Sequence, residues 1–281
     1  MNSRFEILVV AVPPTDVEIA SDIMWGAGAQ AVEEMCVDDR VELLTDLGED
    51  PIGCWSKAVM ATIGVQPEAW SACTRFVERS VADTWKQFAP VTKVGSVRIV
   101  PAWHTDVRTG DEVLIDPGGS FGMGDHPTTR ATLSLALALA ERGDACASVL
   151  DLGCGSGVLG IALALNHGSR VVAVDIAPAA IEATLANVAL NAVSQKFVIE
   201  RGDINSVKGR YDLVLANILA PVLLADRDAI LERVAARGTL ILSGFTDSRL
   251  HDIIESYESA GCRQRNLHEV DGWYGLELQC P

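Results

Sequence analysis

Apolar and polar positions divide the chain into two parts with different patterns. In the first part, residues 5–12 run apolar with alternation, which predicts a strand, and residues 16–26 carry apolar side chains at helical spacing. Further strands are expected at 31–34, 40–44 and 59–65, and a second helix at 67–81. Four strands and two helices within about 90 residues, compared with the β-α-β-β-α-β pattern, predict a small α+β domain of the ferredoxin-like kind over residues 1–90.

The second part alternates short β-branched runs with segments of helical period, which is typical of an α/β domain. Strands are expected at 113–116, 149–150, 171–174, 196–200, 211–215, 239–243 and 275–279. Helices are expected at 130–142, 158–165, 178–191, 222–235 and 250–260. Residues 91–110 are assigned to a linker packed against a domain, because the stretch 84–103 holds two tryptophans, a phenylalanine and two prolines. The α/β domain then covers residues 111–281.

Residues 148–175 form the central pattern of this second part. A short apolar run leads into Asp151, and glycines follow on alternate positions at Gly153, Gly155 and Gly157. An apolar helix and a β-branched strand come next, and the strand ends in Asp175. This order predicts the first half of a nucleotide-binding α/β unit, in which a Cβ at the turn would keep the backbone away from the ligand. Asp175 is placed to accept hydrogen bonds from ribose hydroxyls.

The glycine pattern departs from that of a dinucleotide site. Its spacing is D-x-G-x-G-x-G, with Asp151 expected in the turn and Val158 where the third glycine of G-x-G-x-x-G would fall. An acid beside the site disfavours a pyrophosphate and suits a ligand that carries an ammonium or sulfonium group. S-adenosyl-L-methionine has both groups, a ribose for Asp175 and no phosphate, so it is the cofactor that we expect. A dinucleotide enzyme with a degenerate fingerprint is the alternative.

Two polar residues follow later strands of the predicted sheet. Asn217 comes after the strand at 211–215, at the carboxyl edge where open α/β sheets bind ligands, and is expected to meet the substrate. Asp203 comes after the strand at 196–200, where it can either reach the adenine amino group or serve as a turn residue.

A loop rich in glycine precedes the first helix of the α/β domain. Residues 117–129 hold four glycines between two prolines, so the loop can lie close to a ligand. Thr128 or Thr129 can cap the helix that follows. His126 is interpreted as a structural hydrogen-bonding residue, with a role as a base as the alternative. No second histidine or cysteine stands near it, so no metal site is expected.

Composition narrows the range of partners. A net charge of −16 argues against a phosphate-backbone partner and is compatible with a basic protein substrate, or with nothing more than solubility. Seven cysteines without C-x-x-C spacing favour a reducing cytosol over a disulfide framework. The first residues show no signal-peptide pattern, and the longest apolar stretch is too short to span a membrane. We therefore expect a cytoplasmic protein with no membrane partner and no direct nucleic-acid partner.

With these pieces assembled, the chain resembles the ribosomal protein L-eleven methyltransferases (the PrmA family) over nearly its whole length. The stretches that carry the resemblance are 116–129, 149–162, 171–183 and 211–224. The glycine motif is shared by all class I methyltransferases, whereas the loop His126–Thr129 together with the Ala-Asn-Ile-Leu-Ala sequence at 216–220 is more specific. Two positions differ from the family's usual F-G-T-G-T-H-P-T-T loop, since Met123 replaces a threonine and Asp125 replaces a residue that is often threonine.

The resemblance implies a Rossmann-like class I domain and a protein N-methyltransferase. It implies that residues matching Thr129, Gly153, Asp175 and Asn217 hold the cofactor, and that the N-terminal domain recognises a large-subunit ribosomal protein. The expected reaction is direct displacement of the sulfonium methyl by a lysine or N-terminal α-amine, which Asn217 orients.

Two other functions stay open. A nucleic-acid adenine methyltransferase would also use an asparagine at the fourth strand, although Ile218 and the residues after it offer no ring to stack on a flipped base. A non-catalytic ribosome-assembly factor that keeps the cofactor fold is the other alternative.

Overall fold

The computed structural model describes residues 4–27, 29, 32–47, 53–64, 69–78, 89–106, 109–110, 112–118, 120–144 and 146–281. The chain divides into two compact units, Met1–Ala89 and Pro90–Pro281. Separate clusters of buried apolar side chains fill the two units, so each has a core of its own.

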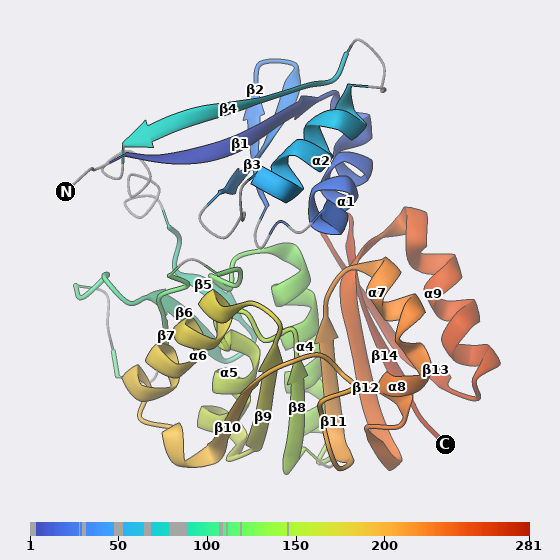
Figure 1. Cartoon of the computed structure of the whole chain (residues 1–281). Coiled ribbons are helices and arrows are strands. Elements are labelled where there is room, and N and C mark those ends of the chain that lie inside the picture. The colour runs from blue at the N-terminus through green and yellow to red at the C-terminus, as the bar shows by residue number, and fades with distance from the viewer. Residues whose placement is uncertain are drawn as a thin grey trace. The chain divides into compact units, whose positions relative to one another are not determined.

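The described part of the smaller unit is an antiparallel sheet of four strands with two helices (Figure 1). Its elements are, in chain order, β1 (Arg4–Val12), α1 (Val17–Ala27), β2 (Glu33–Val37), β3 (Arg40–Asp46), α2 (Cys54–Ile63) and β4 (Ser71–Glu78). The strand order β2-β3-β1-β4 and the β-α-β-β-α-β sequence confirm the ferredoxin-like expectation. Leu8 and Val10 of β1 pack against Met24 of α1 and Val59 of α2, so both helices cover one face of the sheet.

Two elements of this unit were predicted with the wrong type. Residues 59–65 were expected to be a strand and 67–81 a helix, but the structure has α2 at the first position and β4 at the second. In α2 the buried residues are Ser56, Val59 and Ile63, a helical spacing hidden within a β-branched run. β4 lies at the edge of the sheet with most side chains exposed, so it lacks the apolar alternation of a half-buried strand.

The larger unit is built on a seven-stranded sheet with the order β10-β9-β8-β11-β12-β14-β13. The strands are β8 (Ser148–Leu152), β9 (Arg170–Asp175), β10 (Phe197–Arg201), β11 (Tyr211–Asn217), β12 (Val234–Thr246), β13 (Arg263–Val270) and β14 (Trp273–Gln279). The helices are α4 (Pro127–Glu141), α5 (Val158–His167), α6 (Pro178–Leu190), α7 (Ala220–Ala225), α8 (Arg227–Leu231) and α9 (Asp247–Ser259). The first five strands of the order run parallel, and β14 is antiparallel to both of its neighbours.

Helices cover both faces of this sheet (Figure 1). Val149 and Leu213 face one layer, with α4 and α5, whereas Leu150 and Val214 face the other, with α7 and α9. Because alternate side chains are buried on opposite faces, the strands read as continuous apolar runs. Those runs made the central strands predictable from the sequence.

The C-terminal third differs from the prediction in two places. The helix expected at 222–235 is divided into α7 and α8, and its last residues already belong to β12. β13 was missed, because at this edge of the sheet most of its side chains are polar and at least partly exposed.

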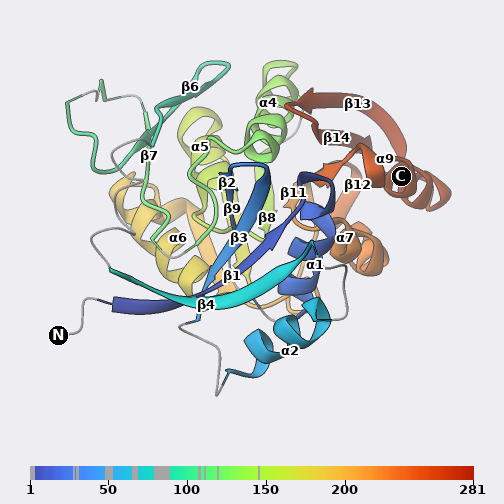
Figure 2. The same cartoon turned by 90° about the horizontal axis from the view of Figure 1, so that it is seen from above.

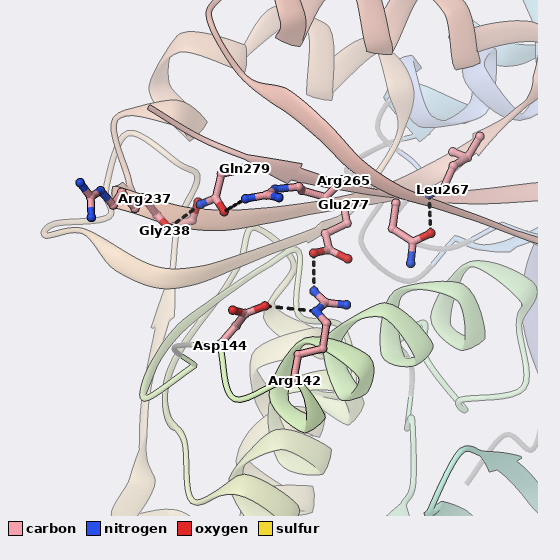
Figure 3. A network of polar contacts seen from close by, with 9 residues as sticks. Arg142, Asp144, Arg237, Gly238, Arg265, Leu267, Glu277 and Gln279 are labelled. Carbon is pink, nitrogen blue, oxygen red and sulfur yellow. Dashed lines mark hydrogen bonds and ion pairs between the residues drawn. The ribbon is translucent and has the colours of Figure 1, made fainter.

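A network of polar contacts fastens the end of α4 to the outer strands (Figure 3). Arg142, the residue after α4, donates to the buried carboxylate of Glu277 on β14 at 2.6 Å and to Asp144 at 3.2 Å. On the same strand, Gln279 accepts from Arg265 of β13 at 3.2 Å. A buried carboxylate needs such a cation, so Arg142 stabilises the packing of α4 on β14.

A second sheet of the larger unit joins β5 (Thr92–Val94), β6 (Val97–Pro101) and β7 (Val113–Ile115) in that order. β5 pairs with β6 antiparallel, and β6 pairs with β7 parallel. The segment 91–110, assigned to a linker from the sequence, therefore contributes two strands to the larger unit. β7 leads directly into the glycine-rich loop, so this sheet supports the start of that loop.

Candidate functional site

The candidate site lies at the carboxyl ends of β8, β9 and β11. β8 is the middle of the three, and the chain leaves it for β9 on one side and returns as β11 on the other. Such a reversal of strand order opens a crevice at the carboxyl edge, where open α/β sheets bind their ligands. The glycine turn, Asp175 and Asn217 all lie at this edge, as the sequence predicts for the strands that carry them.

The glycine turn between β8 and α5 has a backbone that only glycine adopts easily. Gly153 and Gly155 have φ angles of 71° and 54°. A Cβ on Gly153 would lie 2.2 Å from Cγ2 of Ile218, and one on Gly155 would lie 2.5 Å from the carbonyl oxygen of Phe121. Gly157, also at positive φ, is the N-cap residue of α5. The turn is therefore enclosed by Ile218, the residue after β11, on one side and by the glycine-rich loop on the other.

Asp175 joins the end of β9 to this turn. One carboxylate oxygen accepts the Gly155 N–H at 3.0 Å, and the other accepts the Ala177 N–H at 2.9 Å. A carboxylate has about four acceptor positions, so two remain for a ligand. The structure thus places the carboxylate beside the glycine turn, in reach of a ligand that rests on it.

Asn217 is the last residue of β11. Its neighbours in the sheet are Ser243 on β12 and, one residue earlier in register, Leu152 at the end of β8. The side chain is half-buried, and within the part of the chain that the structure describes it makes no hydrogen bond. Its carboxamide is therefore available to a ligand at the same edge as Asp175.

Asp151 occupies a different place from the one expected. It lies within β8 rather than in the turn, is only 1% exposed, and accepts the N–H of Gly160 at 3.0 Å. Gly160 is in the first turn of α5, so the carboxyl group satisfies one of the free N–H groups there. Burial raises the pKa of Asp151 to about 7. The Asp151 carboxyl group thus holds the first turn of α5, which directly follows the glycine turn.

The start of α4 also differs from the prediction. The helix begins at Pro127, so Thr128 and Thr129 are buried in its first turn and neither is its cap. His126 is the N-cap, and its Nδ1 accepts the Thr128 N–H at 3.3 Å. Burial lowers the pKa of His126, which favours the neutral ring that this bond requires. Of the two roles considered for His126, the structure shows the structural one.

Asp203 is exposed at the end of β10 and is used by its own turn. Its carboxylate accepts the N–H groups of Asn205 at 3.0 Å and Ser206 at 3.2 Å. Its pKa is lowered by the side-chain hydrogen bond from Asn205 and by these backbone bonds. The turn role is therefore present in the structure.

The two unusual residues of the loop have different surroundings. Met123 is partly buried and packs on the apolar core of the larger unit. Asp125 is exposed, and its charge acts on His126 by raising the pKa of the imidazole against the stronger effect of burial. Within the described residues, no group of histidine, cysteine and acidic side chains is arranged to hold a metal ion.

Three polar residues, two of α6 and its C-cap residue Asn191, were missed by the sequence reading. Thr184, Asn187 and Asn191 are spaced by three and four residues on one side of the helix, and the first two are fully buried. Thr184 donates to the carbonyl of Gly155 at 2.8 Å, and Asn187 donates to that of Ser156 at 2.9 Å. Polar side chains at helical spacing in an otherwise apolar helix were the available signal.

With this geometry in view, similarity to known proteins is informative. The family described as "Ribosomal protein L11 methyltransferase (PrmA)" matches residues 8–280, which includes every element of the candidate site. The chain belongs to this family.

Curated members of the PrmA family align with large parts of the chain. The "Ribosomal protein L11 methyltransferase" of Dechloromonas aromatica is 41% identical over 177 residues, covering 62% of this chain and 57% of that protein. That of Exiguobacterium sp. is 33% identical over 203 residues, covering 71% of this chain and 64% of that protein. The chain thus spans less than two thirds of the length of these relatives.

A solved structure of the same family supports the fold. A ribosomal protein L11 methylase from Lactobacillus delbrueckii subsp. bulgaricus superposes with a TM-score of 0.61 at 26% identity, covering 68% of this chain and 98% of that one. The larger unit therefore has the α/β fold of the class I methyltransferases. Among the described helices, none combines the length and apolarity needed to cross a bilayer.

Proposed function

We propose that this chain is a protein N-methyltransferase that uses S-adenosyl-L-methionine. Its substrates would be lysine or N-terminal α-amines of a large-subunit ribosomal protein. Membership of the PrmA family and the names of its relatives support this proposal. A cytoplasmic location, expected from the sequence, stays a prediction.

The observation that carries the proposal is the arrangement of Asp175 beside the glycine turn. Its carboxylate is fixed 3.0 Å from the Gly155 nitrogen and keeps acceptor positions for two ribose hydroxyls. The close approach that Gly153 and Gly155 allow fits a nucleoside, and the Asp175 carboxylate suits ribose hydroxyls. Because Asp151 is buried in β8 and does not line the turn, the choice of S-adenosyl-L-methionine over a dinucleotide is supported by membership of the PrmA family. When bound, the cofactor supplies an electrophilic methyl group on a sulfonium.

Asn217 is suited to orient the accepting amine. Only a neutral amine attacks, and at pH 7 about 10% of an α-amine and well under 0.1% of a lysine amine are neutral at ordinary pKa values. A carboxylate at this place would favour the ammonium form, whereas the carboxamide oxygen accepts an N–H without adding negative charge. A lysine would also need desolvation to compete with an α-amine.

Ile218 bears on the adenine methyltransferase alternative. A Cβ on Gly153 would lie 2.2 Å from Cγ2 of Ile218. Ile218, the residue after Asn217, therefore packs on the glycine turn. An aliphatic side chain there gives no stacking surface for a flipped base. This observation favours an amine of a protein over a base of a nucleic acid.

The smaller unit is proposed as the reader of the protein substrate. Its first 50 residues hold two basic and twelve acidic residues, a net charge of −10. β2 is exposed along its whole length, and Glu33 on that strand and Asp38 and Asp39 in the following turn present acids to solvent. Such a surface steers a basic partner, and the attraction weakens with salt.

The site is tested by single-turnover methyl transfer with Asn217→Ala, at saturating cofactor and with a purified large-subunit ribosomal protein. We expect the rate to fall by at least about tenfold, the scale of one lost hydrogen bond in the transition state. Asn205→Ala is the matched control, because Asn205 is exposed in the turn after β10, a strand that does not pair with β11. A wild-type rate for Asn217→Ala would show that another group orients the amine.

The substrate reader is tested by Glu33→Lys together with Asp39→Lys. We expect a higher KM for the ribosomal protein, with kcat and cofactor affinity unchanged. The difference from wild type should shrink as the salt concentration rises. An unchanged KM at low salt would remove this acidic surface from substrate recognition.

A further inference from the structure

Two asparagines, Asn187 in α6 and Asn191 at its C-cap, form hydrogen bonds with β7 and the residue after it in the way that a neighbouring strand would. The Asn191 carboxamide accepts the Leu114 N–H at 2.9 Å and donates to the Leu114 carbonyl at 2.7 Å. Asn187 does the same two residues later, accepting the Asp116 N–H at 2.9 Å and donating to the Asp116 carbonyl at 2.8 Å. β7 is the edge strand of its sheet and lies against α6 (Figure 2). Because the backbone groups of Leu114 and Asp116 point to the same side, the carboxamides of the two asparagines satisfy this open edge.

Asn187 and Asn191 differ in the third contact that each makes. Asn191 Nδ2 donates to the backbone carbonyl of Asn187 at 2.8 Å and so stays within the end of α6, whereas Asn187 reaches the glycine turn. Asn187 Nδ2 donates there to the carbonyl of Ser156, at 2.9 Å. The same amide group therefore holds Asp116, the residue between β7 and the glycine-rich loop, and the turn that precedes α5. Asn187 is only 1% exposed, so these bonds are made away from water, where a lost partner is costly.

Ser156 carries the connection back to the loop. Its N–H donates to the Phe121 carbonyl at 2.9 Å, and its hydroxyl donates to the Gly122 carbonyl at 2.5 Å. Asp116, Phe121 and Ser156 are thus linked in a closed set of contacts with Asn187 at its centre. Phe121 is 45% exposed, and its carbonyl oxygen lies directly beside Gly155 of the glycine turn, so the loop and the turn adjoin at the candidate site.

We propose that Asn187 is a positioning residue that fixes the glycine-rich loop against the glycine turn, so that the two walls of the site keep one relative geometry. The inference rests on the proposed function only for its consequence in cofactor binding. Its structural part concerns the free protein and can be measured without any ligand.

The test compares Asn187→Ala with Asn191→Ala by site-resolved hydrogen exchange of the ligand-free chain. Both variants remove a carboxamide that pairs with β7, so both should lose protection at the amide they cap directly, Asp116 or Leu114. The Ser156 N–H distinguishes them, because neither asparagine bonds to it. We expect its exchange to rise by at least about tenfold in Asn187→Ala and to stay near wild type in Asn191→Ala.

Binding of S-adenosyl-L-homocysteine by calorimetry gives the second readout. We expect at least about tenfold weaker binding for Asn187→Ala than for Asn191→Ala, the scale set by hydrogen bonds to buried groups. If Asn187→Ala does not fold, Asn187→Asp keeps the shape and the acceptor for the Asp116 N–H while losing the donors. It should then show the same two changes.

The outcomes separate the inference from the proposed function. Unchanged exchange at Ser156 in the Asn187 variants, or an equal rise in Asn191→Ala, would overturn the positioning role. Failure of the wild-type chain to bind the cofactor product would contradict the proposed function instead, and the exchange result would still decide the role of Asn187.

Discussion

Asp151 gives the chain a pH dependence that its sequence does not suggest. The carboxyl group is buried beneath the glycine turn, and desolvation raises its pKa to about 7, with a further contribution from the charge of Asp175. The hydrogen bond from the Gly160 N–H acts in the opposite direction but is weaker. In the unfolded chain the same carboxyl has a pKa of about 3.9. Asp151→Asn replaces it with a group that resembles the protonated acid and does not titrate.

The sign and size of the effect follow from the two pKa values. A group whose pKa is higher in the folded state stabilises that state fully below pH 4, and the contribution is lost as the pH rises towards and through 7. Between pH 5 and pH 8, wild type should therefore lose about 2–3 kcal/mol of unfolding free energy relative to Asp151→Asn. The variant should be the relatively more stable protein at pH 8.

Urea unfolding at pH 5, 6, 7 and 8, followed by circular dichroism, measures this difference. Asp203→Asn is the matched control, because the pKa of Asp203 is lowered and its contribution is lost only as the pH falls through the acid range. That variant should run parallel to wild type from pH 5 to pH 8. Parallel curves for Asp151→Asn as well would refute the reasoning and show that Asp151 is ionised, with its charge stabilised by the α5 N-terminus.

Two further predictions concern the cofactor site and the core. Asp175→Ala should weaken binding of S-adenosyl-L-methionine by about tenfold to a hundredfold in calorimetry, from charged hydrogen bonds of roughly 1.5–3 kcal/mol. Asp203→Ala should leave the cofactor affinity unchanged. An equal loss of affinity in Asp203→Ala would instead support the contact with the adenine amino group that the sequence allowed. Tyr257→Phe should destabilise the larger unit by roughly 1–3 kcal/mol, because the buried hydroxyl donates to the Leu223 carbonyl at 2.8 Å. In thermal unfolding, Tyr211→Phe should have less effect, since its bond to Lys208 is exposed.

The sequence predicts the centre of the larger unit well because its constraints are local. A strand buried on both faces must be a continuous apolar run, and a turn with positive φ requires glycine. For this reason the strands before Gly153 and Asp175 lie close to where they were expected. The position of Asn217 follows from the same argument, since it ends the strand next to β8.

Other features depend on contacts that are distant in sequence. α2 became a helix because Val59 and Ile63 pack against the sheet, which a reading of the β-branched run alone misses. The Asp151 side chain contacts the start of α5 and does not line the glycine turn. Its orientation follows from its position inside β8, which pairs with β9 and β11. The contacts of Asn187 to Asp116 and Ser156 join segments 71 and 31 residues away, so no local pattern could reveal them.

Methyl transfer to a purified protein tests the central claim most directly. The wild-type chain is incubated with S-adenosyl-L-methionine carrying a labelled methyl group, together with ribosomal protein L11 and, in a separate reaction, ribosomal RNA. Asp175→Ala is the matched control. We predict that the ribosomal protein gains mass in steps of one methylene, on lysine or N-terminal amines, and that the Asp175 variant is slower. Label in the RNA alone, or no label in either, would contradict the account.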